Sequence, residues 1–271
     1  MFKIDAHCHV YPEKIVEKAV HGIGEFYSIP MCYDGRIETL LKKGKEYGVN
    51  HHIIFSVATK PSQTASINNF IAETCKAYPD KFTGLGTLHP DSEDIEGDVR
   101  HIIELGLKGV KLHPDFQKFA LDDEKCDAIY KACRGKLPIL IHAGDKRYDF
   151  SNPLRLKPVL EKYPDLIIIG AHLSGYSVWD EVEKTLIGYP NLFVDCSSTL
   201  AFITPEKAKR IIDAFGVDKV LFATDFPMWD IGEELNRFDK LGLTEKEKEL
   251  IFYKNACKLF KLDEDKILKS K

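Results

Sequence analysis

The stretch Ile4-Asp5-Ala6-His7-Cys8-His9-Val10 places two histidines one residue apart at the end of the first apolar run of the chain. Successive side chains of a β-strand point to opposite faces, so His7 and His9 share one face while Cys8 points to the other. Two imidazoles on one face can reach the same metal ion. The stretch therefore predicts a strand that ends in a candidate metal site.

Apolar runs of strand length recur eight times, at residues 2–9, 52–58, 82–88, 109–113, 139–142, 166–172, 192–197 and 220–225. Most are near-continuous and rich in Ile, Leu, Val or Phe, which is typical of parallel strands covered on both faces. Amphipathic stretches lie between them, at 36–47, 66–78, 122–133, 154–163 and 205–215. This alternation predicts an α/β fold, a single (β/α)8 TIM barrel domain over residues 1–271. A doubly wound sheet is the alternative, but no glycine-rich turn follows the first strand.

Composition limits the classes of partner. The 38 Lys and Arg residues nearly balance the 42 Asp and Glu residues, without a dense basic run, which argues against a nucleic-acid partner. No secretory signal and no stretch of about 18 apolar residues is visible, which argues against a membrane partner. The seven cysteines form no CxxC pair, which favours reduced thiols. We therefore expect a cytoplasmic protein with a small-molecule substrate; formation of a homo-oligomer stays open.

Polar side chains gather where the predicted strands end. The active sites of such barrels lie at the C-terminal ends of the strands. Neutral imidazole and carboxylate are ligands of zinc and, to a lesser extent, of iron and manganese. We expect a divalent metal ion, with zinc as the first choice. The strand-end residues are His7, His9, His89, Lys111, His113, His142, His172 and Asp225. Of these, we interpret His89, which Pro90 follows, as part of a turn.

Several motifs in barrel order resemble the amidohydrolase superfamily, and within it the amidohydrolase-2 branch of metal-dependent hydrolases and nonoxidative decarboxylases. The resemblance covers nearly the whole chain. Its motifs are Asp5-Ala6-His7-Cys8-His9, Gly109-Val110-Lys111-Leu112-His113-Pro114, Ile141-His142-Ala143, Gly170-Ala171-His172, Ala223-Thr224-Asp225-Phe226-Pro227 and Lys254-Asn255-Ala256-Cys257-Lys258-Leu259-Phe260.

The resemblance implies roles for five of these residues. His7, His9 and His142 would bind the metal, and Asp225 would ligate it or orient a metal-bound water. His172 occupies the place of an acid/base group, although in binuclear relatives its strand supplies a ligand. A divalent ion lowers the pKa of bound water and polarises a substrate oxygen, while a nearby carboxylate and imidazole move the protons.

Lys111 and His113 leave two alternatives open. They lie two residues apart and thus share a face of their strand. Superfamily members with two metals often carry a carboxylated lysine here, so both residues are candidates for a second metal. Lys111 can equally bind a substrate carboxylate or pair with Asp225. The resemblance favours one metal per chain over two.

Two loops are candidates for the substrate pocket. Residues 22–33 carry more aromatic side chains than a simple connection needs, which suggests a lid or packed aromatics. Residues 145–148 offer cations for an anionic substrate, or a solvated loop.

For function, we expect a metal-dependent hydrolase that cleaves a C–O or C–N bond of a small molecule. The first alternative is a nonoxidative decarboxylase of a small carboxylic acid, and the second is a noncatalytic metal-binding barrel.

Overall fold

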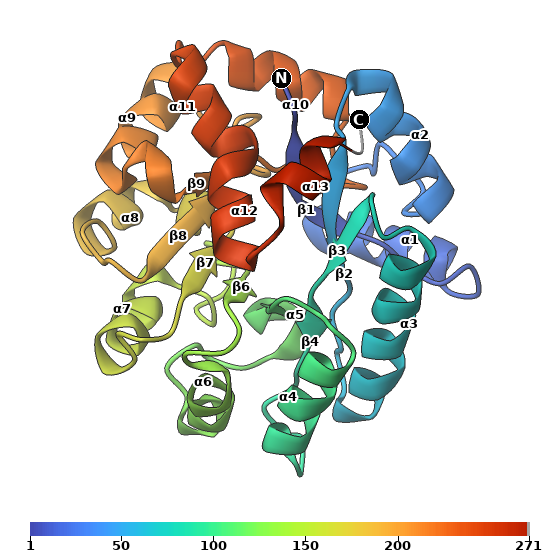
Figure 1. Ribbon diagram of the computed structural model, residues 1–271. Helices are drawn as coiled ribbons and strands as arrows, with labels where there is room; N and C mark the ends of the chain where they lie inside the picture. The colour runs from blue at the N-terminus through green and yellow to red at the C-terminus, as the bar shows by residue number, and fades with distance from the viewer. Residues whose placement is uncertain (270–271) are drawn as a thin grey trace.

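Parallel strands form the inner ring of the molecule, and helices surround them (Figure 1). The computed structural model describes residues 1–269. Nearly every strand residue is buried, because helices cover the outer face of the ring and side chains fill its interior. The strands are β1 (Ile4–His9), β2 (His51–Phe55), β3 (Phe82–Gly84), β4 (Gly86–Thr87), β5 (Val110–Leu112), β6 (Ile139–Ile141), β7 (Ile168–Gly170), β8 (Leu192–Asp195) and β9 (Val220–Leu221).

Hydrogen bonds run in sequence order around the ring, through β1-β2-β3 and then through β4 to β9. The predicted strand 82–88 is divided at Leu85, whose amide donates to Ile54 O at 2.9 Å, whereas the Gly86 amide donates to Gly109 O at 2.9 Å. β3 thus pairs with β2 and β4 pairs with β5, and together the two short strands occupy one strand position in the ring. The Ala6 amide donates to Phe222 O at 2.9 Å and joins β1 to the last strand. The ring is closed, and the prediction of a (β/α)8 TIM barrel is confirmed.

Four of the five predicted amphipathic stretches match helices to within two residues at each end, and the helix in 122–133 begins five residues later than predicted. The described helices are α1 (Val16–Tyr27), α2 (Ile37–Tyr47), α3 (Thr64–Ala77), α4 (Ile95–Glu104), α5 (Pro114–Gln117), α6 (Asp127–Cys133), α7 (Pro153–Lys162), α8 (Trp179–Thr185), α9 (Pro205–Phe215), α10 (Ile231–Asp239), α11 (Glu245–Glu249), α12 (Asn255–Phe260) and α13 (Glu264–Lys269).

One expected loop is in part a helix. Residues 22–27, expected to lie in a loop after the first strand, form the second half of α1. Val16, Ala19, Val20 and Ile23 follow the helical spacing, which was an available signal for this helix, although Val16 alone is buried in it. The helix ends at Tyr27 because Ser28 adopts a left-handed conformation with φ of 55°.

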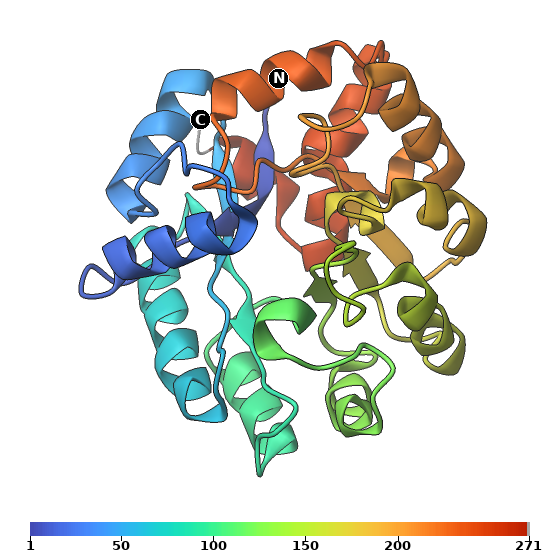
Figure 2. The same ribbon diagram turned by 180° about the vertical axis from the view of Figure 1, so that it is seen from behind.

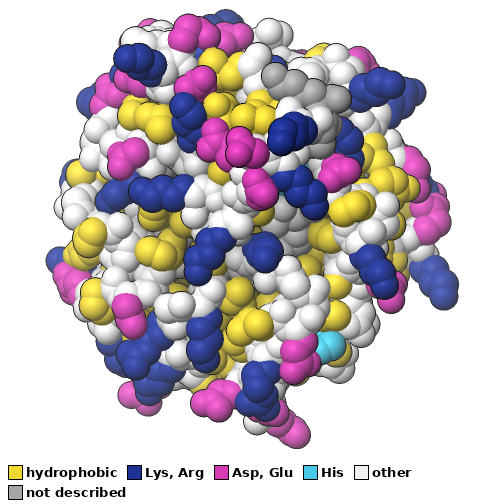
Figure 3. Space-filling model, in the orientation of Figure 1, with side chains coloured by type: hydrophobic (Ala, Val, Ile, Leu, Met, Phe, Trp, Pro, Cys, Tyr) yellow, Lys and Arg dark blue, Asp and Glu magenta, His cyan; other side chains and the backbone are white. Residues whose placement is uncertain are grey.

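The two ends of the barrel carry different elements. α12 and α13 lie in front in Figure 1, whereas α1 and α5 lie in front in the reverse view, at the carboxyl ends of the strands (Figure 2). On the face in Figure 3, basic and acidic side chains are interspersed. None of the helices formed by residues 1–269 combines the length and the apolar character needed to cross a membrane. All seven cysteines are free thiols.

Candidate metal centre and active site

The site residues expected from the sequence converge on one cavity at the carboxyl ends of the strands. They come from β1 and β5 and from the segments that directly follow β5, β6, β7 and β9. Each is nearly inaccessible to solvent. The predicted residues that line the cavity are His7, His9, Lys111, His113, His142, His172 and Asp225.

Three of these side chains lie close enough to share one ion. His7 Nε2 is 3.2 Å from His9 Nε2, and Asp225 Oδ1 is 3.3 Å and 3.6 Å from these two nitrogens. Ligands that surround an ion tetrahedrally at about 2.1 Å lie about 3.4 Å apart. Burial lowers the pKa of both imidazoles well below the ordinary value, so their neutral, ligating form is favoured. The donor set and its spacing therefore fit a divalent cation.

A buried carboxylate fixes the ring of His7. His7 Nδ1 lies 2.9 Å from Asp195 Oδ2, so this nitrogen carries the hydrogen and donates it. His7 Nε2, on the other side of the ring, keeps its lone pair and faces His9 and Asp225. Ligating histidines are commonly held this way by a carboxylate behind them.

His142 does not belong to this three-residue cluster. Its Nδ1 lies 3.0 Å from His172 Nε2, and its Nε2 is 3.6 Å from Asp115 Oδ2. His142 Nε2 and Asp115 Oδ1 are both buried without a hydrogen-bond partner among residues 1–269. The structure thus places His142 beside the cluster, and its role as a further ligand stays a prediction.

The ring of His172 is oriented by the end of β8. Its Nδ1 lies 3.0 Å from the carbonyl oxygen of Ser197, which can only accept, so Nδ1 carries the hydrogen and Nε2 is bare. Burial lowers the pKa of His172 to about 4, against the opposing charge of Asp195. Nε2 accepts the hydrogen of His142 Nδ1 at 3.0 Å, so it can take up a proton only when this contact opens.

Lys111 is fully buried, and its Nζ lies 3.3 Å from His7 Nε2. Burial lowers the pKa of Lys111 to about 8, although Asp195 and Asp225 partly restore the charged form. A pKa of 8 keeps the ammonium mostly protonated at neutral pH. Lys111 is the one Lys or Arg among the described residues that line the cavity.

Both ring nitrogens of His113 are engaged. Its Nδ1 accepts the Phe116 amide hydrogen at 3.3 Å, so Nε2 carries the ring hydrogen of the neutral imidazole. Nε2 lies 2.8 Å from the Tyr27 hydroxyl and donates to it. His113 therefore acts on the cavity through Tyr27, and neither nitrogen is left to bind a second metal in this conformation.

The end of α1 covers the cavity. Tyr27 lines it, and Arg147 donates to the carbonyl oxygen of Phe26 while its guanidinium lies 4.7 Å and 5.1 Å from the centres of the Phe26 and Tyr27 rings. Arg147 is itself paired with Asp145 at 2.7 Å. Arg147 thus holds α1 and is not among the residues that line the cavity, and substrate binding by the cations of residues 145–148 stays a prediction. The covered cavity measures about 20 Å³, room for a water molecule.

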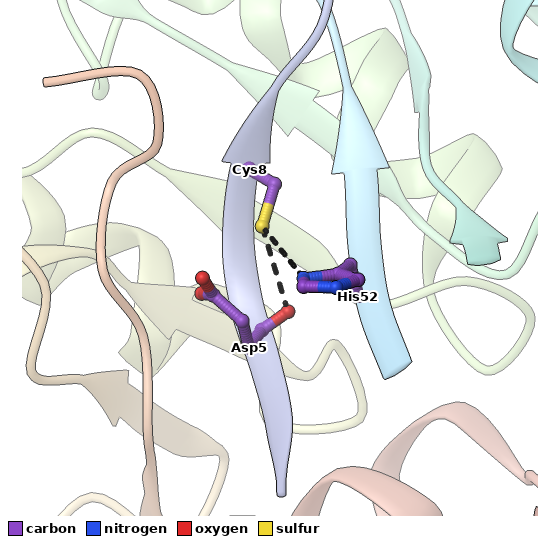
Figure 4. Close-up of side chains that lie close together, drawn as sticks. All are labelled: Asp5, Cys8 and His52. Carbon is purple, nitrogen blue, oxygen red and sulfur yellow. Dashed lines mark hydrogen bonds between the residues drawn. The ribbon is translucent and has the colours of Figure 1, made fainter. Parts of the chain in front are cut away.

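A second group of potential ligands lies on the outer side of β1. Cys8 Sγ lies 3.8 Å from His52 Nδ1 and 3.9 Å from the backbone oxygen of Asp5 (Figure 4). A carboxylate oxygen of Asp5 also lies within 4.8 Å of the Cys8 and His52 atoms. That carboxylate accepts the hydroxyl and amide hydrogens of Thr224, at 2.5 Å and 3.0 Å. This group ties β1 to its neighbours.

Sequence reasoning missed three residues that shape the site. Asp195 stands inside the predicted apolar strand 192–197, and a carboxylate in such a strand was an available signal. Asp115 directly follows His113-Pro114, and its place beside a candidate ligand was an available signal. Ser198 has no distinguishing sequence feature, and its contact with Asp225 at 2.5 Å depends on the fold.

Comparison with known proteins gives the same assignment at the level of the family. Residues 4–262 match the family model described as amidohydrolase. A gamma-resorcylate decarboxylase from Polaromonas sp. is 26% identical over 256 residues, covering 76% of this chain and 78% of that protein. An uncharacterized TIM-barrel protein from Bordetella bronchiseptica superposes with a TM-score of 0.80 at 19% identity, covering 97% and 99% of the two chains.

A third protein, the 5-carboxyvanillate decarboxylase from Novosphingobium aromaticivorans, superposes with a TM-score of 0.76 at 22% identity and covers 96% of each chain. Its structure contains manganese and 4-hydroxy-3-methoxy-5-nitrobenzoic acid. The two structural likenesses show the fold, and the match of the family model shows the family. The chain belongs to the amidohydrolase family.

Proposed function

We propose that this protein is a metal-dependent nonoxidative decarboxylase of a small aromatic carboxylic acid. The observation that carries the proposal is the combination of the His7, His9 and Asp225 cluster with the cationic Lys111 beside it, in a chain whose curated relative is a decarboxylase. The expectation of a hydrolase finds no support among these relatives, so decarboxylation, the first alternative from the sequence, takes its place.

The cation would be held by His7 Nε2, His9 Nε2 and Asp225 Oδ1, with His142 as a further candidate ligand. We propose manganese in place of the expected zinc, since a solved relative contains manganese and this mixed donor set accepts either metal. A bound divalent cation would stabilise negative charge on the substrate oxygens. One ion per chain is proposed, because His7, His9 and Asp225 offer three ligands in one place and both ring nitrogens of His113 are engaged by other residues.

Lys111 and His172 would supply the remaining chemistry. The Lys111 ammonium can pair with the carboxylate or a phenolate of the substrate. When the bond between the ring and the carboxylate breaks, its electron pair stays on the ring carbon and carbon dioxide leaves. That carbon needs one proton. His172 Nε2 can deliver it after giving up its hydrogen bond from His142 and taking up a proton, because a bound anion favours the protonated imidazole.

The experiment supplies Mn²⁺-loaded protein with 2,6-dihydroxybenzoate and related hydroxybenzoates, and measures carbon dioxide and the decarboxylated phenol. A parallel panel of esters, lactones and amides tests hydrolysis. We expect carbon dioxide from at least one benzoate and no hydrolysis. Hydrolysis without carbon dioxide would restore the first expectation, and a metal-loaded protein inactive on both panels would favour the noncatalytic barrel.

Two variants test the residue roles. His172→Asn should retain metal and lose turnover by roughly 100-fold or more, because it keeps a polar group but cannot exchange a proton. Asp225→Asn should lose turnover and also bind metal more weakly, because it removes a negative charge beside the ion. Near-normal turnover in metal-replete His172→Asn would refute its role in proton transfer.

A further inference from the structure

The Asp225 carboxylate is held from one side by two residues outside the cluster. Its Oδ2 lies 2.5 Å from Ser198 Oγ, and Ser198 Oγ lies 2.7 Å from Trp229 Nε1. Ser198 belongs to the segment after β8, and Trp229 to the segment after β9. The contact therefore joins two neighbouring segments at the carboxyl end of the barrel.

The hydrogen atoms in this chain of contacts are determined by chemistry. An indole N–H can only donate, so Ser198 Oγ accepts from Trp229. The single hydroxyl hydrogen of Ser198 is then free for Asp225 Oδ2. Met228 Sδ lies 3.5 Å from the same hydroxyl, but a thioether accepts weakly compared with a carboxylate. Ser198 therefore donates to Asp225 Oδ2.

Ser198 and Asp225 both have an unusual backbone conformation at this contact. Ser198 has φ of 44° and Asp225 has φ of 62°, in the left-handed region that non-glycine residues enter at a cost. Ser198 is 1% exposed and Asp225 7% exposed. Both residues thus adopt an unfavourable backbone conformation, and their side chains meet in one buried hydrogen bond. This indicates that the orientation of the Asp225 carboxylate is constrained.

We infer that Ser198 and Trp229 are positioning residues that occupy Asp225 Oδ2 and leave Oδ1 as the single oxygen presented to a divalent cation. The inference rests on the metal site of the proposed function. Oδ1 is the oxygen that faces His7 and His9, at 3.3 Å and 3.6 Å. Hydrogen bonds of this kind behind a ligand commonly change metal affinity by 10- to 100-fold.

The test measures Mn²⁺ binding to the metal-freed full chain by electron paramagnetic resonance of free Mn²⁺. Ser198→Ala and Ser198→Gly both remove the hydroxyl, and glycine also relieves the backbone. We expect both to weaken Mn²⁺ binding by about 10- to 100-fold. Trp229→Phe keeps an aromatic ring but loses the N–H and part of the indole, while the Ser198 hydroxyl that donates to Asp225 stays, so we expect a smaller loss of about 2- to 10-fold.

Ser174→Ala is the matched control, because Ser174, near the same end of the barrel, has a buried hydroxyl that no other residue of 1–269 contacts by a hydrogen bond. We expect it to bind Mn²⁺ as the parent does. A crystal structure of the Mn²⁺-loaded parent should show Asp225 bound through Oδ1 alone, with Oδ2 still on Ser198. This readout would not respond to a merely structural role of Ser198.

Three results would overturn the inference: Mn²⁺ binding in Ser198→Gly within about twofold of the parent, binding of Mn²⁺ by both oxygens of Asp225, or no Mn²⁺ binding by the parent. If a Ser198 variant fails to fold, Mn²⁺ binding by Trp229→Phe and the crystal structure of the Mn²⁺-loaded parent still test the inference. A parent that binds Mn²⁺ as described but releases no carbon dioxide from any benzoate refutes the proposed decarboxylase and leaves this inference standing.

Discussion

His7 Nδ1 and Asp195 Oδ2 lie 2.9 Å apart in a pair that solvent does not reach. The other oxygen, Asp195 Oδ1, accepts the amide hydrogens of His172 and Ser197 and the Ser197 hydroxyl, at 3.1, 3.0 and 2.5 Å. Asp195 is thus surrounded by donors on one side and by the His7 ring on the other. The pair determines which nitrogen of His7 can bind a metal.

Asp195→Asn should reverse the tautomer of His7. Three donors face Oδ1, so the amide oxygen of asparagine takes that side and its NH2 group faces His7 Nδ1. His7 then accepts at Nδ1 and carries its hydrogen on Nε2, where the metal should bind. We expect Mn²⁺ affinity to fall by about 10- to 100-fold, with the change of tautomer visible by ¹⁵N NMR of the histidines. Asp149→Asn, at an exposed ion pair with Arg155, is the control. An unchanged His7 tautomer in Asp195→Asn would contradict this account.

Lys111 distinguishes one bound metal from two. If it stays an ammonium, native mass spectrometry should show one metal per chain and no added carbon dioxide. Lys111→Met, which removes the charge but keeps the length, should then impair substrate binding or turnover far more than metal retention. A mass increase of one carbon dioxide together with two metals would instead establish a carboxylated lysine that bridges two ions.

The cover over the cavity has to open for any aromatic substrate, because about 20 Å³ admits only a water molecule. Arg147→Ala removes the group that holds the end of α1, so we expect faster hydrogen exchange in residues 22–33 than in the parent. Arg155→Ala is the matched control, since Arg155 forms ion pairs with Asp122 and Asp149. In the parent, 2,6-dihydroxybenzoate should alter this exchange. Equal exchange in Arg147→Ala and the parent would show that Arg147 does not hold the cover.

The sequence predicted the barrel because strand periodicity and strand-end polarity are local properties. His7 and His9 could be placed on one face from spacing alone, and barrel order brought Asp225 beside them. The split of the third strand at Leu85 could not be predicted, because it arises when neighbouring strands compete for its amides.

The hydrogen bonds that orient the candidate ligands could not be predicted either, because they join residues far apart in the sequence. Asp195 reaches His7 across 188 positions, and Ser198 reaches Asp225 only because both backbones turn left-handed. The cover was partly predictable: the aromatic residues of 22–33 suggest a lid, and the helical spacing of Val16, Val20 and Ile23 could have indicated the helix.

Glu234 on α10 should make the stability of the fold depend on pH. Burial raises the pKa of Glu234 to about 7, although the Arg237 guanidinium at 2.5 Å favours the charged form. One of its oxygens is buried without a partner among residues 1–269. The folded state thus holds a proton that the unfolded state, with a pKa near 4.3, releases earlier. The free energy of unfolding should therefore fall as pH rises from about 4.5 to about 7, and stay lowered above that range.

Glu234→Gln cannot ionise and should lack this fall. The difference in free energy of unfolding between Glu234→Gln and the parent should increase, in favour of the variant, by on the order of 2–3 kcal/mol from pH 4.5 to pH 8. The altered contact with Arg237 adds the same cost at both pH values and does not change this increase. Urea denaturation at both pH values measures the difference. Glu233→Gln is the matched control, because Glu233 pairs with the same Arg237 from an exposed position, and its stability should follow the parent at both pH values. Parallel pH profiles for Glu234→Gln and the parent would mean that Glu234 is ionised in the folded protein throughout this range.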